Sequence, residues 1–253
     1  MKLILRNIKL TIEYDGTDFC GWQIQTKNKK KDSIQKIIRE ALKTILKEEV
    51  RLIGSGRTDS GVHAKGQVAN FKTNSNISIK GLHKSLNGIL PNKIRIKEVR
   101  EVPMDFNARF DATAKLYRYT ILNRKFSSPF YDKFVYFVPH KLDIKAMKMA
   151  AGFFLGRHNF SNYCAQDKIK KGSKIRDIKR LLIKKTDGLI NIDIEANGFL
   201  HNMARRIAGA FVQVGLKKIA PCDIKKSLKD KENLSIKYTA PSKGLCLMKV
   251  DYS

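Results

Sequence analysis

The chain has 253 residues and 42% of them are hydrophobic, which allows one large domain or two moderate ones with a sizeable core. Lysine and arginine number 51 against 23 acidic residues, a formal net charge of +28, so we expect a polyanionic partner, with nucleic acid favoured over a genome-wide lysine bias. No apolar run is long enough to span a bilayer, and the N-terminal segment lacks a signal-peptide pattern.

The first half of the chain alternates between strand and helix patterns. Apolar residues recur at helical spacing from Ile34 to Leu46, with Asp32 or Ser33 as the cap and Gln35 placed for a capping box. The predicted order is strand 7–14, helix 34–46, strand 50–53, strand 68–72, helix 81–86 and strand 94–102.

The second half repeats this rhythm with additions. A hairpin is expected around the TDG turn at 186–188, because glycine accepts the backbone conformation of a tight turn. The predicted order is strand 112–122, helix 144–155, strands 175–184 and 189–196, helix 200–214, a short helix after Pro221 and strand 245–252.

These patterns predict an α+β protein with two halves, residues 1–105 and 106–253. Each half is expected to hold an antiparallel sheet with helices on one face, as in ferredoxin-like or RNP-like folds. We further expect the two sheets to join, with an active-site cleft between the halves.

The four cysteines at 20, 164, 222 and 246 are far apart and form no paired motif, which argues against a structural zinc site. In the absence of a secretory signal we expect reduced thiols in a cytoplasmic protein. We also expect no cofactor.

Residues 54–64, GSGRTDSGVHA, form a glycine-rich turn that displays Asp59 beside Arg57. The loop lacks the lysine of a phosphate-binding GxxxxGK[ST] motif, and no cluster of acidic residues or histidines surrounds it. The residues leave two interpretations open. Asp59 is a nucleophile or base held by its turn, or it is a turn aspartate that bonds its own backbone.

Segment 56–64 resembles the signature of the tRNA pseudouridine synthase A family, in which the aspartate is catalytic. The resemblance runs nearly end to end, in ordered motifs at family-like spacing. Further matches are YDG at 14–16, GWQ at 21–23, SIQ at 33–35, LNGIL at 86–90 with Pro91, FNARF at 106–110, ATAKLYRY at 112–119, FLHNMAR at 199–205 and APSKGLCL at 240–247.

The resemblance implies a role for each matched position. Asp59 starts the isomerisation, either by attacking ribose C1′ or by removing the C2′ proton, while Arg205 pairs with its carboxylate. Tyr117 stacks on the target base, Leu245 forms an apolar wall of the base pocket, and Arg57 helps to extrude the nucleotide.

Other cations are candidates for phosphate contacts. Arg206 is one, and the lysine run supplies Lys29, Lys30 and Lys31, for which a solvated loop is an equal alternative. Each of the five histidines, His63 included, is expected to have a structural or RNA-contacting role rather than a catalytic one.

The resemblance therefore implies a cofactor-free isomerase that converts uridine to pseudouridine at positions 38, 39 and 40 of the tRNA anticodon stem-loop. It also implies a homodimer with a basic groove across both subunits. Two alternatives stay open: a synthase of this fold acting on ribosomal RNA, and a non-catalytic RNA-binding module.

Overall fold

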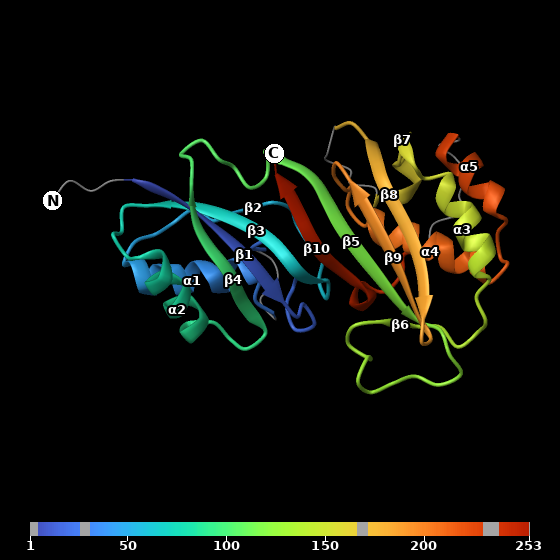
Figure 1. The fold of residues 1–253 in the computed structure, drawn as a ribbon, viewed down its shortest axis with the longest axis horizontal. Helices are drawn as coiled ribbons and strands as arrows, with labels where there is room; N and C mark the ends of the chain where they lie inside the picture. Colours follow the sequence, from blue (N-terminus) through green and yellow to red (C-terminus); the bar gives the residue numbers. More distant parts are fainter. Residues whose placement is uncertain (1–4, 26–30, 166–171, 230–237, 253) are drawn as a thin grey trace. The chain divides into compact units, whose positions relative to one another are not determined.

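The computed structural model describes residues 5–25, 31–165, 172–229 and 238–252 (Figure 1). The chain divides into two compact units: Met1–Thr113 with Leu247–Ser253 form unit 1, and Ala114–Cys246 form unit 2. The chain leaves unit 1 within strand β5 (Ala112–Leu122) and returns to it within β10 (Leu245–Tyr252). The units therefore differ from the expected halves, 1–105 and 106–253, chiefly because the end of the last strand belongs to the first unit.

Unit 1 has the order of elements that the sequence predicts. They are β1 (Arg6–Tyr14), α1 (Ile34–Leu46), β2 (Ile53–Gly54), β3 (His63–Thr73), α2 (Ile79–Ile89) and β4 (Ile94–Val102). The strands follow the order β4-β1-β3-β10, and β2 pairs with β3. Strand β1 is antiparallel to both of its neighbours, β3 and β4.

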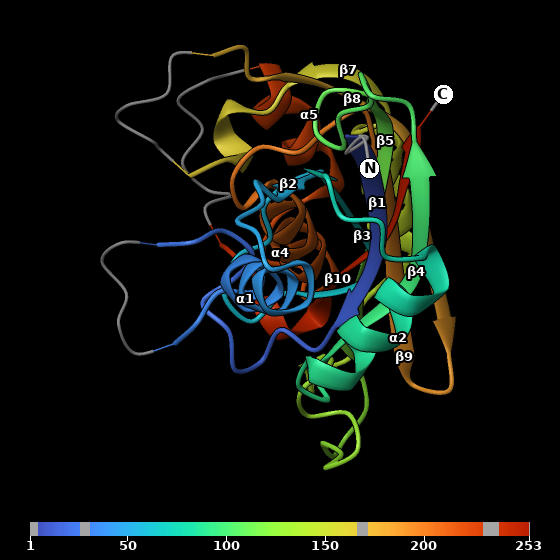
Figure 2. The same cartoon turned by 90° about the vertical axis from the view of Figure 1, so that its left-hand side faces the viewer.

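Helix α1 forms where the sequence predicts it, because one face of the segment is apolar. That face is buried, and α1 and α2 pack together on one side of the unit 1 sheet (Figures 1 and 2). Ser33 caps the helix by accepting the Lys36 amide, and Lys47 ends it in the left-handed region at φ 59°. Gln35 makes no capping box. Its amide donates to the Leu52 carbonyl and accepts from the Ile24 amide, so it ties α1 to two loops.

Unit 2 continues from β5 through short and long elements. They are β6 (Tyr136–Phe137), α3 (Ile144–Gly152), β7 (Gly156–Asn159), β8 (Ile175–Thr186), β9 (Leu189–Ala196), α4 (Met203–Gly215) and α5 (Pro221–Lys229). Its strands follow the order β5-β9-β8-β7, antiparallel throughout, and β6 adds a short parallel pairing to β5. Helix α3 packs against α4, α5 and β8 (Figure 1).

The β8–β9 hairpin turns where the TDG sequence predicts. Asp187 and Gly188 both have positive φ, 49° and 79°, which is the backbone of a tight hairpin turn. Helix α4 is buried nearly all round, from Met203 to Gly215. Gly209 allows this close packing, because a Cβ there would meet the Tyr238 carbonyl oxygen at 2.2 Å.

The α+β class is confirmed, and β4, β5, β9 and β10 have the predicted bounds. Helix α1 also has its predicted bounds, whereas other bounds were wrong: β3 begins at His63 rather than 68, and α2 covers Ile79–Ile89 rather than 81–86. Helix α4 starts three residues late because Asn202 adopts the left-handed conformation at φ 63°. The joining of the two sheets and a cleft between the halves stay predictions.

Candidate active site

The loop 54–64 connects β2 to β3 in unit 1. Glycine is needed at its two ends for different reasons. A Cβ at Gly54 would meet the indole of Trp22 at 2.4 Å, so the strand lies directly against that ring. Gly61 has φ +76°, a conformation that side chains with a Cβ rarely adopt. The loop is therefore a fixed turn, built by close backbone packing.

The start of the loop is held by Gln67, a side chain with no exposed surface. Its amide group donates to the Gly56 carbonyl at 3.1 Å, and its oxygen accepts the Ser55 hydroxyl at 2.7 Å. The Ser55 amide also donates to the Val68 carbonyl at 2.8 Å. Buried polar groups that satisfy one another in this way fix the first residues of the loop against β3.

The middle of the loop is held by the last residue of β1 and by the segment that follows this strand. The buried hydroxyls of Tyr14 and Thr58 lie 2.8 Å apart and share a hydrogen bond. The Trp22 amide donates to the Thr58 carbonyl at 3.1 Å, and the Ser60 hydroxyl donates to the Phe19 carbonyl at 3.1 Å. Both neighbours of Asp59 in the chain are thus bonded to a different segment.

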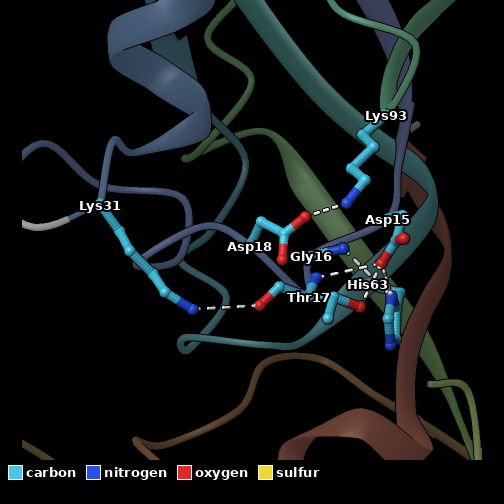
Figure 3. Close-up of polar contacts among 7 residues, drawn as sticks. All are labelled: Asp15, Gly16, Thr17, Asp18, Lys31, His63 and Lys93. Atoms are coloured by element: carbon cyan, nitrogen blue, oxygen red, sulfur yellow. Dashed lines mark hydrogen bonds and ion pairs between the residues drawn. The ribbon is translucent and has the colours of Figure 1, made fainter. Parts of the chain in front are cut away.

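The end of the loop is held by a turn at Asp15–Thr17 (Figure 3). The Gly16 amide donates to Nδ1 of His63 at 3.1 Å, and an oxygen of Asp15 lies 3.2 Å from the same nitrogen. A Cβ at Gly16 would meet the Val62 carbonyl oxygen at 2.0 Å, so the two backbones are in direct contact. Contacts at the start, the middle and the end of the loop therefore fix the backbone on both sides of Asp59.

Asp59 is half-buried within this frame, and its carbonyl accepts the Val62 amide at 3.1 Å. Arg57, two residues earlier, is exposed. Lys31 is exposed and donates to the Thr17 carbonyl at 3.4 Å (Figure 3). Lys29 and Lys30 lie outside the described residues. The RNA-binding roles of these cations stay predictions.

A second carboxylate, Asp15, lies beside this loop and is already committed to its own turn. Burial raises the pKa of Asp15, but the Thr17 hydroxyl and amide and the charge of Lys93 hold the pKa below its ordinary value. Asp18 pairs with Lys93 (Figure 3). Asp15 is therefore suited to hold the turn rather than to accept a proton.

Unit 2 carries the other predicted site residues. Tyr117 is buried on β5, with Phe199 edge-on to its ring at a centroid distance of 4.8 Å. Arg205 lies on α4, where Nε donates to the Ala240 carbonyl at 2.8 Å and Nη1 donates to Oδ1 of Asn202 at 3.3 Å. The guanidinium is thus held by backbone and amide oxygens of its own unit.

Tyr119 links these residues within unit 2. Burial raises its pKa well above the ordinary range, against the lowering effect of the nearby Arg205 charge, so the phenol stays protonated. Its hydroxyl donates to the Pro241 carbonyl at 2.8 Å, and Gly244 packs on its ring. Arg205 therefore lies near Tyr119 on strand β5. The buried Leu245 follows Gly244, which packs on the ring of the same tyrosine.

Arg206 has a different environment from Arg205. Its Nη1 donates to the Cys164 carbonyl at 2.5 Å and to the Asn162 carbonyl at 3.4 Å, which secures the turn after β7 to α4. Its Nε is buried with no hydrogen-bond partner among the described residues. A contact from Arg206 to RNA stays a prediction.

The structure thus gathers Arg57 and Asp59 in unit 1, and Tyr117, Arg205 and Leu245 in unit 2. Their convergence on one substrate stays a prediction. Sequence reasoning missed Gln67 as a support of the loop, since nothing in its spacing marks it.

The described residues contain no group of three or more histidines, cysteines, aspartates or glutamates that could hold a metal ion. None of the helices among these residues has the length and apolar character that a membrane crossing needs.

Comparison with known proteins decides the family. A family model described as tRNA pseudouridine synthase matches residues 10–111 and 150–253. The chain belongs to the tRNA pseudouridine synthase family. Both matched segments contain predicted site residues: Asp59 lies in the first, and Arg205 and Leu245 lie in the second. Tyr117 lies between them.

Curated members of the tRNA pseudouridine synthase family are similar over nearly the whole chain. A tRNA pseudouridine synthase A of Thermoanaerobacter sp. is 43% identical, and one of Caldicellulosiruptor bescii is 45% identical, each over 98% of this chain and 100% of the relative. A tRNA pseudouridine synthase A 2 of Clostridium perfringens is 45% identical over the same shares. A solved Cbf5-Nop10-Gar1 complex is similar at a TM-score of 0.34 and 11% identity, covering 99% of this chain and 58% of that one.

Proposed function

We propose that the protein is an isomerase that converts uridine to pseudouridine in tRNA. The observation that carries the proposal is the loop around Asp59: a carboxylate in the family's motif, with its peptide bonded on both sides. A carboxylate held in one place suits a reaction in which its oxygen must reach a single atom of the ribose, as a nucleophile or as a base. The net charge of +28 supports a polyanionic substrate.

The reaction breaks the bond between ribose C1′ and uracil N1, and forms a bond between C1′ and uracil C5. The proton on C5 is then lost to solvent, and N1 gains a proton, so no redox partner or co-substrate is consumed. Asp59 assists either by attacking C1′ or by removing the C2′ proton to give a glycal. Both routes need the ionised carboxylate.

The other site residues have proposed roles that follow from their chemistry. Tyr117 offers an aromatic face on which the detached uracil stacks while it turns, and Leu245 adds an apolar wall. Arg205 pairs with the carboxylate of Asp59 and keeps it ionised. Arg57 helps to hold the nucleotide outside its stack, and Arg206 and Lys29, Lys30 and Lys31 contact phosphates.

The finer substrate claim is positions 38, 39 and 40 of the anticodon stem-loop. Recognition of the tRNA by shape and phosphate positions would suit a single site that reaches neighbouring uridines. We further propose that the protein acts in the cytoplasm.

We also propose that the protein is a homodimer. The segment 123–135 of unit 2 supports this, because Phe130 is 87% exposed and Phe126 is 70% exposed. Neighbouring large apolar side chains on a surface are typical of a protein interface. Light scattering of the wild type and of Phe130→Asp tests the dimer: the wild type should have twice the mass of the variant. Equal masses would exclude this surface as the dimer interface.

The test of the activity is tritium release from tRNA transcripts that carry 5-tritiated uridine. Wild type should release tritium, and both Asp59→Ala and the isosteric Asp59→Asn should release none while still binding tRNA. Asp187→Asn is the matched control, because Asp187 is an exposed turn aspartate of unit 2 and asparagine tolerates its positive φ.

Three outcomes separate the alternatives. Release from ribosomal RNA but not from tRNA refutes the tRNA substrate. A tRNA with cytidine at 38, 39 and 40 that still releases tritium refutes the anticodon positions. Wild-type protein that binds RNA but releases tritium from none is a non-catalytic RNA-binding module.

A further inference from the structure

His63 is the last residue but one of the family motif, four residues after Asp59, and no step of the proposed reaction uses it. His63 is only 5% exposed, so its ring is buried in unit 1 and is not accessible to a ligand. Its ring points at the turn formed by Asp15, Gly16 and Thr17 (Figure 3).

The contact at Nδ1 requires a particular protonation state. The Gly16 amide always carries its hydrogen, so at 3.1 Å it donates to Nδ1, and Nδ1 must hold a lone pair. An Nδ1 that carried a hydrogen would instead face Asp15 Oδ1, 3.2 Å away, and would lose the Gly16 amide. Acceptance of the bond from Gly16 calls for the neutral ring with its hydrogen on Nε2.

The Gly16 turn is in contact with the loop of Asp59. The Cβ position of Gly16 is 2.0 Å from the Val62 carbonyl oxygen, which leaves no room for the turn to approach further. The Val62 amide donates to the Asp59 carbonyl at 3.1 Å and closes the tight turn that follows Asp59. A shift of Gly16 would therefore be transmitted through Val62 to Asp59.

The turn is fixed on its other side as well. The Asp15 amide donates to the Lys93 carbonyl at 3.0 Å, and Asp15 Oδ1 accepts the Thr17 amide at 3.0 Å and the Thr17 hydroxyl at 2.5 Å. The turn is thus held on both sides, and the ring of His63 is one of its contacts with the motif.

We propose that His63 is a positioning residue for Asp59: its Nδ1 lone pair holds the Gly16 turn against Val62 and so sets the place of the carboxylate. The expected effect on kcat rests on the proposed function. The expected effect on the loop 54–64 rests on the geometry of unit 1 alone. In this role His63 makes no contact with substrate.

Two substitutions by neutral amides isolate the lone pair. In His63→Asn the amide oxygen can take the place of Nδ1, so the bond from Gly16 is kept. In His63→Gln the oxygen reaches toward the place of Nε2 instead, so that bond is lost. Both variants are neutral amides at one buried position, and each is the control for the other.

We expect His63→Gln to lower kcat for tritium release about 10- to 100-fold, the scale of a displaced catalytic group, with KM for tRNA within about twofold of wild type. His63→Asn should restore kcat to within about threefold of wild type. Gly16→Ala, which drives a methyl group into the Val62 carbonyl, should reproduce the loss of kcat. Equal kcat in His63→Asn and His63→Gln overturns the proposal.

Two measurements need no activity, and the first needs only the wild-type protein. Nitrogen NMR of ¹⁵N-histidine-labelled wild type should show Nδ1 of His63 as unprotonated and accepting a hydrogen bond; a hydrogen on Nδ1 overturns the proposal. Amide exchange of the peptide covering 54–64 should be slow in wild type and His63→Asn and faster in His63→Gln. If wild type releases no tritium from any RNA, the proposed function fails, and the exchange rates still decide the role of His63.

Discussion

The hydrogen bond between Tyr14 and Thr58 is the most direct support of the residue that precedes Asp59, and it can be measured by a double-mutant cycle. Both side chains are buried, at 3% and 6% exposure, and their oxygens lie 2.8 Å apart. Tyr14→Phe removes one hydroxyl and Thr58→Val removes the other, at nearly constant shape. Each single change removes the partner in this bond from the other buried hydroxyl, which lowers the free energy of unfolding by about 1–3 kcal/mol.

The double variant removes both hydroxyls together, so it should cost less than the sum of the two single variants. Hydrogen-bonded neighbours of this kind show coupling energies of about 0.5–3 kcal/mol, and full burial places this pair at about 1–2 kcal/mol. Thr58→Ser is the control, because it keeps the hydroxyl and should keep the coupling with Tyr14.

The assay for this cycle is urea unfolding followed by the fluorescence of Trp22, the single tryptophan of the chain. Trp22 is buried in unit 1, and its ring centroid is 6.3 Å from that of Tyr14, so the signal reports the unit that contains the bond. The single variants should also lower kcat for tritium release. Costs that add to within about 0.5 kcal/mol would refute the coupling, and an unchanged kcat would refute its part in placing Asp59.

Three further predictions follow from other contacts. Gly244→Ala should destabilise the protein by about 1–3 kcal/mol in thermal unfolding, because a Cβ there would lie 2.7 Å from the ring of Tyr119. Gly152→Ala is the control: a Cβ there has nothing within 4 Å, so it should cost less than about 1 kcal/mol of stability, and equal losses would contradict the packing argument. The pKa of Asp15 lies below its ordinary value of 3.8, so its carboxylate stabilises the fold above that pH and the stabilisation is lost as pH falls through the lowered pKa; in unfolding curves measured over a pH series, Asp15→Asn should flatten this acid dependence, and an unchanged curve would contradict it. KM for tRNA should rise steeply with salt, since phosphate contacts release counterions, and a salt-independent KM would argue against the basic surface as the binding site.

Much of the fold could be predicted because the deciding information is local. The apolar spacing from Ile34 to Leu46 and the alternation in 94–102 and 189–196 mark one buried face each, and those elements have the predicted extents. The short strands Tyr136–Phe137 and Gly156–Asn159 were missed, because two or four residues carry no period and their pairing depends on distant partners.

The site divides in the same way. Asp59 and Arg57 are visible in a glycine-rich motif, and the motifs around Tyr117, Arg205 and Leu245 identify the family. The contacts that hold the loop join residues far apart in the chain: Thr58 to Tyr14, Gly56 to Gln67, and His63 to Gly16. Single-sequence patterns contain no signal for such pairs, and a glutamine such as Gln35 or Gln67 reads as a surface residue until its buried partners are known.

The return of the chain to unit 1 within β10 has a consequence for synthesis on the ribosome. Unit 1 contains the loop of Asp59, yet its strand order ends in β10, whose Met248 carbonyl lies against Gly66 of β3. All of unit 2 emerges before Leu247, where the strand enters unit 1, so the inserted unit can fold while the first unit still lacks this strand. A nascent chain that stops before Leu247 leaves the part of β3 that meets β10 unpaired on that side, which makes truncated products prone to aggregate.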